Sequence, residues 1–179
     1  MHRIASFPGN EPQEEITFIE QPTAPIIFLT SATTDITCLS TVIKQPKNKN
    51  WRNKIRALPI AYLSSNAGID HYLSSTCQKA EIILVRFLGS RSYWSYGFEQ
   101  LSLWQLEKPN RKLIVIPGIE SAANDLLDLS SENQDLIDFM QILLNQGGEN
   151  NYNYMLNILG EIIDNKEPNF NTQTIEYHN

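Results

Sequence analysis

The sequence predicts a single α/β domain of three layers, flavodoxin-like or Rossmann-like, with a mainly parallel sheet between two layers of helices. Three short apolar runs, at 26–29, 82–85 and 113–116, have the composition of strands buried on both faces. Segments with helical spacing of apolar residues separate these runs, and strands that alternate with helices favour a parallel sheet. A length of 179 residues, of which 41% are hydrophobic, suits one domain with a substantial core.

Composition narrows the class of protein. The net charge of −6 argues against general nucleic-acid binding. Cys38 and Cys77 have no CxxC partner and are expected to be reduced core thiols. The first ten residues lack the apolar run of a signal peptide, and no run is long enough to cross a bilayer. We therefore expect a soluble, cytoplasmic protein with no nucleic-acid or membrane partner.

The first third of the chain reads as two strands and a helix. Residues 15–20 begin with polar and apolar residues in alternation, which predicts a short edge strand. The β-branched run 26–29 predicts a central strand, and the helix after it is expected to be capped by Thr33 or Thr34. Its apolar positions have helical spacing: Ile36, Leu39 and Ile43.

Residues 44–54 form a polar segment with five basic residues and one aromatic, Trp51. Such a cluster can contact phosphates, but in an acidic protein a solvated connection is the favoured interpretation. Residues 55–63 read as extended. Pro59 has no N–H to donate, so any strand there either lies near an edge of the sheet or starts after Pro59.

The second half alternates helices with the two remaining strands. Residues 64–68 predict a loop and cap, and the later Gly147-Gly148 pair is expected to end a helix whose capping box begins at Ser131. We assign residues 1–164 to the domain and residues 165–179 to a polar, disordered tail. The predicted core-facing helix positions are Ile69, Tyr72, Leu73, Thr76, Trp94, Phe98, Leu101, Trp104, Leu136, Met140, Leu143, Leu144, Met155, Ile158, Leu159 and Ile162.

Three predicted strands should end at the same edge of the sheet, which is where open α/β sheets bind ligands. Hydroxyls and backbone N–H groups follow these strands, and Arg91 can pair with a carboxylate or phosphate. Tyr93 or Trp94 can add a stacking face, although both could equally pack in the core. The candidate ligand-binding residues are Thr30, Ser31, Gly89, Ser90, Arg91, Ser92, Tyr93 and Trp94. Pro117-Gly118 ends the third of these strands.

The sequence contains no GxGxxG and no GxxxxGK[ST], so neither a dinucleotide site nor a nucleoside triphosphate site is indicated. No grouping of Ser, Cys or His has the local signature of a nucleophile elbow. His71 has no partner at metal-ligand spacing and is expected on the surface. We therefore predict no catalytic residue and no metal ligand.

A set of segments, taken in order along residues 1–165, resembles the N-terminal region of the cobaltochelatase large subunit CobN, a relative of the magnesium chelatase H subunit. The tyrosine–tryptophan turn between Gly89 and Gly97 is the most specific of them, and the strand segments alone are less specific. The matching segments are 1–4 with Pro8-Gly9, 18–21, 25–30, 88–97, 113–118 and 147–150.

The resemblance implies a role in cobalamin biosynthesis. In that family the large subunit binds a tetrapyrrole, hydrogenobyrinic acid a,c-diamide, and a cobalt ion, while separate AAA+ subunits hydrolyse ATP to drive metal insertion. The implied partners are these subunits, the tetrapyrrole and the rest of the large subunit. Because this chain is far shorter than the family's full length, we expect it to bind no cofactor itself and to be inactive alone.

Two other functions are compatible with the residues. The hydroxyl-rich turn at 30–34 could hold a flavin or another phosphorylated ligand, although flavodoxin turns contain a glycine and this one does not. Alternatively, the chain is a folded fragment with no present ligand.

Overall fold

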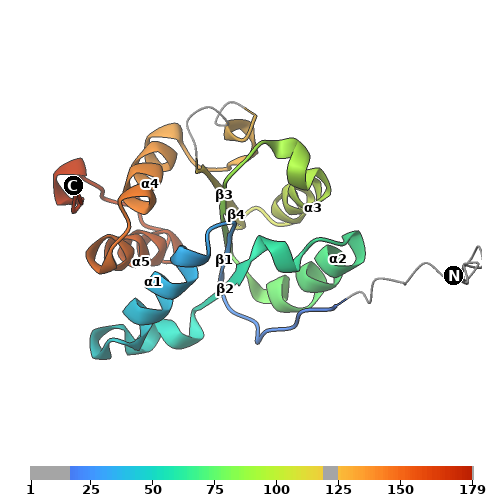
Figure 1. Ribbon diagram of the computed structural model, residues 1–179, viewed down its shortest axis with the longest axis horizontal. Helices are drawn as coiled ribbons and strands as arrows, with labels where there is room; N and C mark the ends of the chain where they lie inside the picture. Colours follow the sequence, from blue (N-terminus) through green and yellow to red (C-terminus); the bar gives the residue numbers. More distant parts are fainter. Residues whose placement is uncertain (1–16, 119–124, 179) are drawn as a thin grey trace, which may run out of the picture.

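A computed structural model describes residues 17–118 and 125–178. Within them, four parallel strands form one sheet in the order β2-β1-β3-β4, with helices on both faces (Figure 1). The prediction of a three-layer α/β domain is confirmed. The strands are β1 (Ile26–Thr30), β2 (Ile55–Pro59), β3 (Ile82–Phe87) and β4 (Lys112–Pro117).

The strand order distinguishes between the two predicted fold types. β1 lies between β2 and β3, so the chain first adds a strand on one side of β1 and then crosses to the other side. That is the flavodoxin-like order, whereas a Rossmann sheet places its second strand between its first and third. The point where the order reverses lies between the carboxyl ends of β1 and β3.

Successive side chains of each strand point to opposite faces of the sheet, so the core has two parts, one on each face. In β1, Ile26 and Phe28 pack with α1 (Thr33–Lys44), α4 (Gln134–Gln146) and α5 (Glu149–Ile163). Ile27 and Leu29 pack toward α2 (Asn66–Ser74) and α3 (Ser95–Leu106) (Figure 1). All four side chains are buried, because helices cover both faces of a parallel sheet.

Both strands at the margins of the sheet have backbone groups bonded to side chains. In β2 the carbonyl of Ala57 accepts from Gln21 Nε2 at 3.1 Å, and the carbonyl of Ile55 accepts from Arg56 Nη1 at 2.8 Å. In β4 the N–H of Val115 donates to Ser130 Oγ at 2.8 Å. The position of β2 confirms the first of the two alternatives for residues 55–63, a strand at an edge of the sheet, but residues 60–62 form a 3₁₀ turn and are not extended.

The strand predicted at 15–20 is wrong over its described part, because residues 17–24 have no strand pairing. This segment instead crosses α2 and the turn after it. Gln21 N–H donates to Thr76 Oγ1 at 2.9 Å, and Tyr72 donates its hydroxyl proton to Gln21 Oε1 at 2.7 Å. Positions 15 and 16 lie outside the described residues.

Two predicted helix caps are also wrong. α1 has Ala32 at its N-cap and no capping side chain, so neither Thr33 nor Thr34 caps it. α4 is capped by Asn133, whose Oδ1 accepts from Leu136 N–H at 2.9 Å. The cap predicted within residues 64–68 is confirmed: it is Ser65, whose hydroxyl accepts from Gly68 N–H at 3.0 Å.

Residues 46–53, predicted as part of a polar loop, form the 3₁₀ helix η1 (Pro46–Asn53). The other short 3₁₀ turns within residues 17–118 and 125–178 are η2 (Ile60–Tyr62), η3 (Thr76–Lys79), η4 (Arg91–Trp94), η6 (Leu127–Leu129) and η7 (Thr172–Thr174).

The segment after α5, for which the sequence predicts a polar, disordered tail, runs back over α4 and α5 at residues 165–178. Ile175 is 5% exposed within the α1/α4/α5 core, and Phe170 lies 5.0 Å from Phe139 between ring centroids. Asn151 bonds both the N–H and the carbonyl of Glu176, at 2.9 and 2.8 Å. Phe170 and Ile175 are surrounded in the sequence by polar residues, so the composition of the segment did not indicate that they pack against the core.

Candidate functional site

The carboxyl ends of β1, β3 and β4 meet at one edge of the sheet, as the sequence predicts. Ser31 N–H donates to Arg86 O at 3.0 Å, and Ser31 Oγ accepts from Leu88 N–H at 3.1 Å. Gly118 N–H donates to Phe87 O at 2.8 Å. The structure therefore brings together the segments containing Thr30–Ser31, the loop after β3 and Gly118.

The loop from Gly89 to Tyr93, here called the β3 loop, is the open part of this edge. Gly89 has φ of 144°, a backbone conformation that other residues rarely adopt, and it turns the chain out of β3. Ser90 and Ser92 share a hydrogen bond at 2.7 Å, and Arg91 N–H donates to Asp125 Oδ2 at 2.9 Å. Tyr93 is 81% exposed, so its ring and the exposed Arg91 side chain are accessible to a ligand.

Trp94, the other predicted stacking residue, points into the core. It is 9% exposed, it lies 5.2 Å from Phe98 in an edge-to-face arrangement, and its Nε1–H donates to Leu63 O at 2.9 Å. A Cβ atom at Gly97 would clash with the Trp94 ring, so glycine at that position allows the indole to pack against α3. Trp94 therefore anchors the β3 loop and offers no face to a ligand.

Thr30 is likewise withdrawn from the surface. Its side chain is fully buried, and its hydroxyl donates to Asp35 Oδ2 at 2.5 Å and accepts from Ala32 N–H at 2.9 Å. These bonds position the first turn of α1. The exposed members of the predicted set are therefore Ser31, Arg91, Ser92 and Tyr93, with Gly89 and Ser90 half-buried.

Sequence reasoning missed a buried polar group below this edge, here called the Asp35 cluster (Thr30, Asp35, Arg86, Asn145 and Tyr152). Asp35 is 2% exposed and accepts from Arg86 Nη1 at 2.5 Å and from the Tyr152 hydroxyl at 2.6 Å. Arg86 Nη2 donates to Asn145 Oδ1 at 2.9 Å. The cluster thus joins β1, β3, α1, α4 and α5, and a charged residue near the end of the apolar β3 run was its sequence signal.

Burial and the negative charge of Asp35 raise the pKa of Tyr152, so its hydroxyl keeps its proton and remains a donor. Beside the cluster lies a cavity of about 280 Å³ that also contacts Cys38 and the Gly147-Gly148 turn. Burial, followed by the charge of Glu149, raises the pKa of Cys38. That thiol is therefore protonated at neutral pH and is a poor nucleophile.

Metal-ligating side chains are dispersed in the described ranges. Among residues 17–118 and 125–178, no group of three or more His, Cys, Asp or Glu side chains is arranged to hold an ion. His71 lies 2.8 Å from Glu20 and packs against Phe18, as a surface residue of α2. In the same ranges, no helix combines the length and apolar content that crossing a bilayer requires.

No family model matches the sequence. The chain is 26% identical over 162 residues to the aerobic cobaltochelatase subunit CobN of Pseudomonas aeruginosa. It resembles part of a CobN-type subunit. The alignment covers 84% of this chain and 12% of that relative, so the chain spans only a small share of the relative's length.

A solved structure, the catalytic subunit of cobaltochelatase from Mycobacterium tuberculosis, has a similar fold. Its TM-score is 0.60 at 18% identity, and the match covers 84% of this chain and 11% of that one. The resemblance to the CobN-type subunit predicted from the sequence is thereby confirmed, and the structural match supports the fold.

Proposed function

We propose that this chain acts as the α/β component of a cobaltochelatase large subunit, in ATP-dependent insertion of cobalt into a corrin ring during cobalamin biosynthesis. The observation that carries the proposal is the similarity to CobN along 84% of the chain. The flavodoxin-like sheet supports it, because the similar solved structure is also a cobaltochelatase subunit.

In this proposal the chain does not perform the chemistry by itself. Metal insertion requires ligands for the ion and a base that removes two pyrrole protons. The described residues offer no cluster of metal ligands, so the rest of the large subunit would supply these groups. ATP would be hydrolysed on AAA+ partner subunits, and cobalt and the tetrapyrrole would be substrates of the whole complex.

The β3 loop is the part of this chain that we assign to contact with the tetrapyrrole. Arg91 and Tyr93 are exposed at the carboxyl edge, where α/β sheets bind ligands, and they offer a cation and an aromatic face. Corrin precursors carry peripheral carboxylates and an extended apolar ring system, which suit these two groups.

Reconstitution tests the proposal. The chain is mixed with the separately expressed remainder of the large subunit, AAA+ subunits, Mg-ATP, cobalt and hydrogenobyrinic acid a,c-diamide. We expect the absorbance change of cobalt insertion only when this chain is present, and none when it is omitted. No association with the remainder at micromolar concentration would overturn the proposal.

Titration of the chain with the same tetrapyrrole tests the contact. Trp94 lies directly beneath the β3 loop, so binding there should quench its fluorescence. The Arg91→Ala/Tyr93→Ala double variant should lose the quenching. Ser74→Ala, an exposed site on α2, is the matched control and should not.

The alternative function, a flavodoxin-like module for a flavin or another phosphorylated ligand, has the switch point of the sheet in its favour. However, the Thr30 hydroxyl of the turn after β1 is buried and donates to Asp35, so it is not free to bond a phosphate. A colourless purified protein whose spectrum and stability are unchanged by added FMN excludes a flavin.

A further inference from the structure

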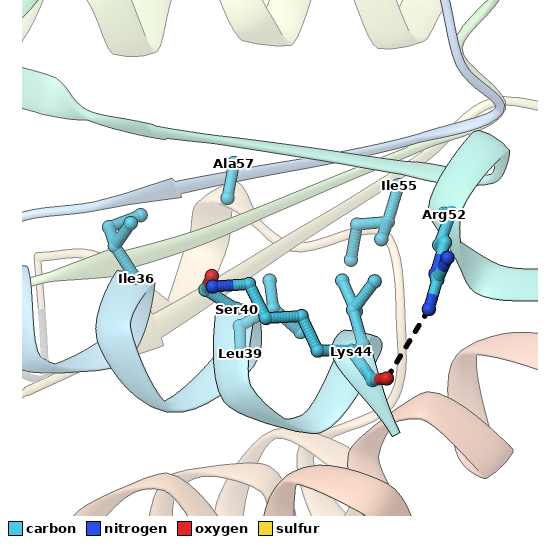
Figure 2. A pocket seen from close by; sticks show the side chains of 8 residues that line it. Ile36, Leu39, Ser40, Lys44, Arg52, Ile55 and Ala57 are labelled. Carbon is cyan, nitrogen blue, oxygen red and sulfur yellow. Dashed lines mark hydrogen bonds between the residues drawn. The ribbon is translucent and has the colours of Figure 1, made fainter. Parts of the chain in front are cut away.

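A groove runs between α1 and β2 at the margin of the sheet, on the opposite side of α1 from α5. Its volume is about 460 Å³, and Figure 2 shows Ile36 and Leu39 of α1 facing Ile55 and Ala57 of β2 across it. Ile43 adds to its apolar floor, Ser40 contributes a hydroxyl, and Lys44 and Arg52 also line it. These eight residues are here called the α1–β2 groove.

Positive charge gathers around this groove. Residues 36–69 contain six Lys or Arg and no Asp or Glu, in a chain whose net charge is −6. The remaining residues therefore carry a net charge of −12. Five of the six lie between the end of α1 and the start of β2, and two of these five, Lys44 and Arg52, line the groove. The five are here called the basic rim: Lys44, Lys47, Lys49, Arg52 and Lys54. All five are exposed, and none makes an ion pair within residues 17–118 and 125–178.

The geometry favours an occupant that packs over the groove and not one that extends the sheet. Two carbonyls of β2, those of Ile55 and Ala57, already accept bonds from Arg56 and Gln21. Pro59 ends the strand without an N–H. An added strand would find few free backbone groups, whereas an amphipathic helix can lay its apolar side chains between α1 and β2.

We propose that the α1–β2 groove and its basic rim dock an acidic amphipathic segment from the rest of the large subunit. This inference rests on the proposed function. The matched part is 12% of the CobN relative and 11% of the similar solved structure, so in the proposed function a large body of polypeptide is available to contact this domain. The basic side chains make no ion pair with the described residues, and the groove floor is mainly aliphatic. A complementary partner segment therefore has apolar residues that enter the groove and acidic residues on either side of them.

Two other occupants fit less well. In a two-fold dimer the groove would face its own copy, which would place the basic rim against an identical positive surface. Single-stranded nucleic acid binds through aromatic stacking platforms, but the groove floor is aliphatic. Trp51, the aromatic of η1, is half-buried and packs against Gly160 of α5.

The test compares two double variants with the same change of charge. Lys44→Glu/Arg52→Glu reverses the rim, and Lys79→Glu/Lys108→Glu reverses two exposed lysines outside the groove. Binding of each to the separately expressed remainder of the large subunit is measured by titration calorimetry at low and high salt. Ser40→Trp fills the groove without a charge change, and Ser74→Trp is its control on α2.

We expect the rim variant to weaken binding at least tenfold at low salt, with a smaller difference at high salt. Ser40→Trp should also weaken it, whereas both controls should bind as the unchanged chain does. Thermal unfolding curves confirm that each variant is folded. Hydrogen exchange in the complex should show protection at α1 and η1.

Each remaining outcome overturns the inference. If the chain binds the remainder but neither groove variant weakens binding, the docking site lies elsewhere and the proposed function stands. If no variant, nor the unchanged chain, binds the remainder, the proposed function fails together with the inference. A rim variant that instead abolishes self-association in sedimentation, or binding to labelled single-stranded DNA, identifies one of the other occupants.

Discussion

The two helical layers hold the same sheet by different means. The α1/α4/α5 layer is tied to the end of β3 by the Asp35 cluster, a buried ion pair with hydroxyl and amide partners. The α2/α3 layer is tied to it by aromatic packing, in which Phe87, Trp94 and Phe98 contact one another. Both anchors lie under the carboxyl edge, and each fixes one side of the loops there.

The difference predicts how much stability the protein loses when a residue of either anchor is substituted. Aromatic packing loses free energy in proportion to the volume removed. A buried ion pair is sensitive to the loss of one member, because the other is left charged in a poor solvent. Apart from Gly89, whose φ of 144° favours glycine, the exposed β3 loop between them should tolerate substitution, since its side chains are not part of either anchor.

The largest effect is expected at the aromatic anchor. Trp94→Ala should lower the free energy of unfolding by about 3–5 kcal/mol, because it leaves a cavity beside Phe87 and Phe98 and removes the bond to Leu63 O. Urea denaturation measures this. The neighbouring Tyr93→Ala is the control and should change the same quantity by about 0.5 kcal/mol or less. Equal effects at the two positions would contradict the assignment of Trp94 to the core.

A somewhat smaller effect is expected at the ionic anchor. Arg86→Met should cost about 3 kcal/mol, at the lower end of the range for breaking a buried pair, because the Thr30 and Tyr152 hydroxyls still bond Asp35. The Asp35→Asn/Arg86→Met double variant removes both charges and should recover part of that loss. If the double variant is the less stable of the two, the cost does not come from an unpaired Asp35.

Tyr152→Phe should cost about 1.5–3 kcal/mol, since it removes one hydrogen bond to a buried carboxylate without creating a cavity. Tyr154→Phe, on the same helix but with its hydroxyl bonded only to an exposed backbone N–H, is the control and should cost less. Urea denaturation at neutral pH gives both values, and similar values would weaken the role assigned to Asp35.

Much of the fold could be predicted because it depends on residues close in sequence. The apolar runs located β1, β3 and β4, and helical spacing located the faces of α4 and α5 that carry Leu136, Met140, Met155 and Ile158. Apart from the two helix caps, the errors concern partners far apart in the chain. Asp35 lies 51 residues from Arg86 and 117 from Tyr152, and no local pattern signals such contacts.

Separation along the sequence also decided which features of the candidate site could be predicted. The meeting of three strand ends followed from the parallel sheet, so the place of Ser31 and the β3 loop could be predicted. Which side chains point outward could not, because the burial of Thr30 depends on Asp35 and that of Trp94 depends on Leu63. The α1–β2 groove was signalled only by its basic residues.

The smallest expected effect is a pH dependence of the unfolding free energy that comes from the α2/α3 layer. Burial raises the pKa of Cys77, in the α2/α3 core, from 9.0 to about 12. The folded state therefore favours the protonated thiol, and this stabilisation is present below pH 9 and lost as the pH rises toward 12. Between pH 9 and 10 it should fall by about 1 kcal/mol. In Cys77→Ala the decline of unfolding free energy over that interval should be shallower, and an unchanged slope would exclude the thiol as its source.

The bonds at the two margins of the sheet have a consequence for the behaviour of the protein at high concentration. Gln21 and Arg56 on one side, and Ser130 with Ser131 on the other, occupy backbone groups that a strand from a neighbouring molecule would need. Exposed sheet margins are where globular proteins begin to form fibrils. Side chains that close both margins should keep this four-stranded sheet from acting as a template for its own aggregation.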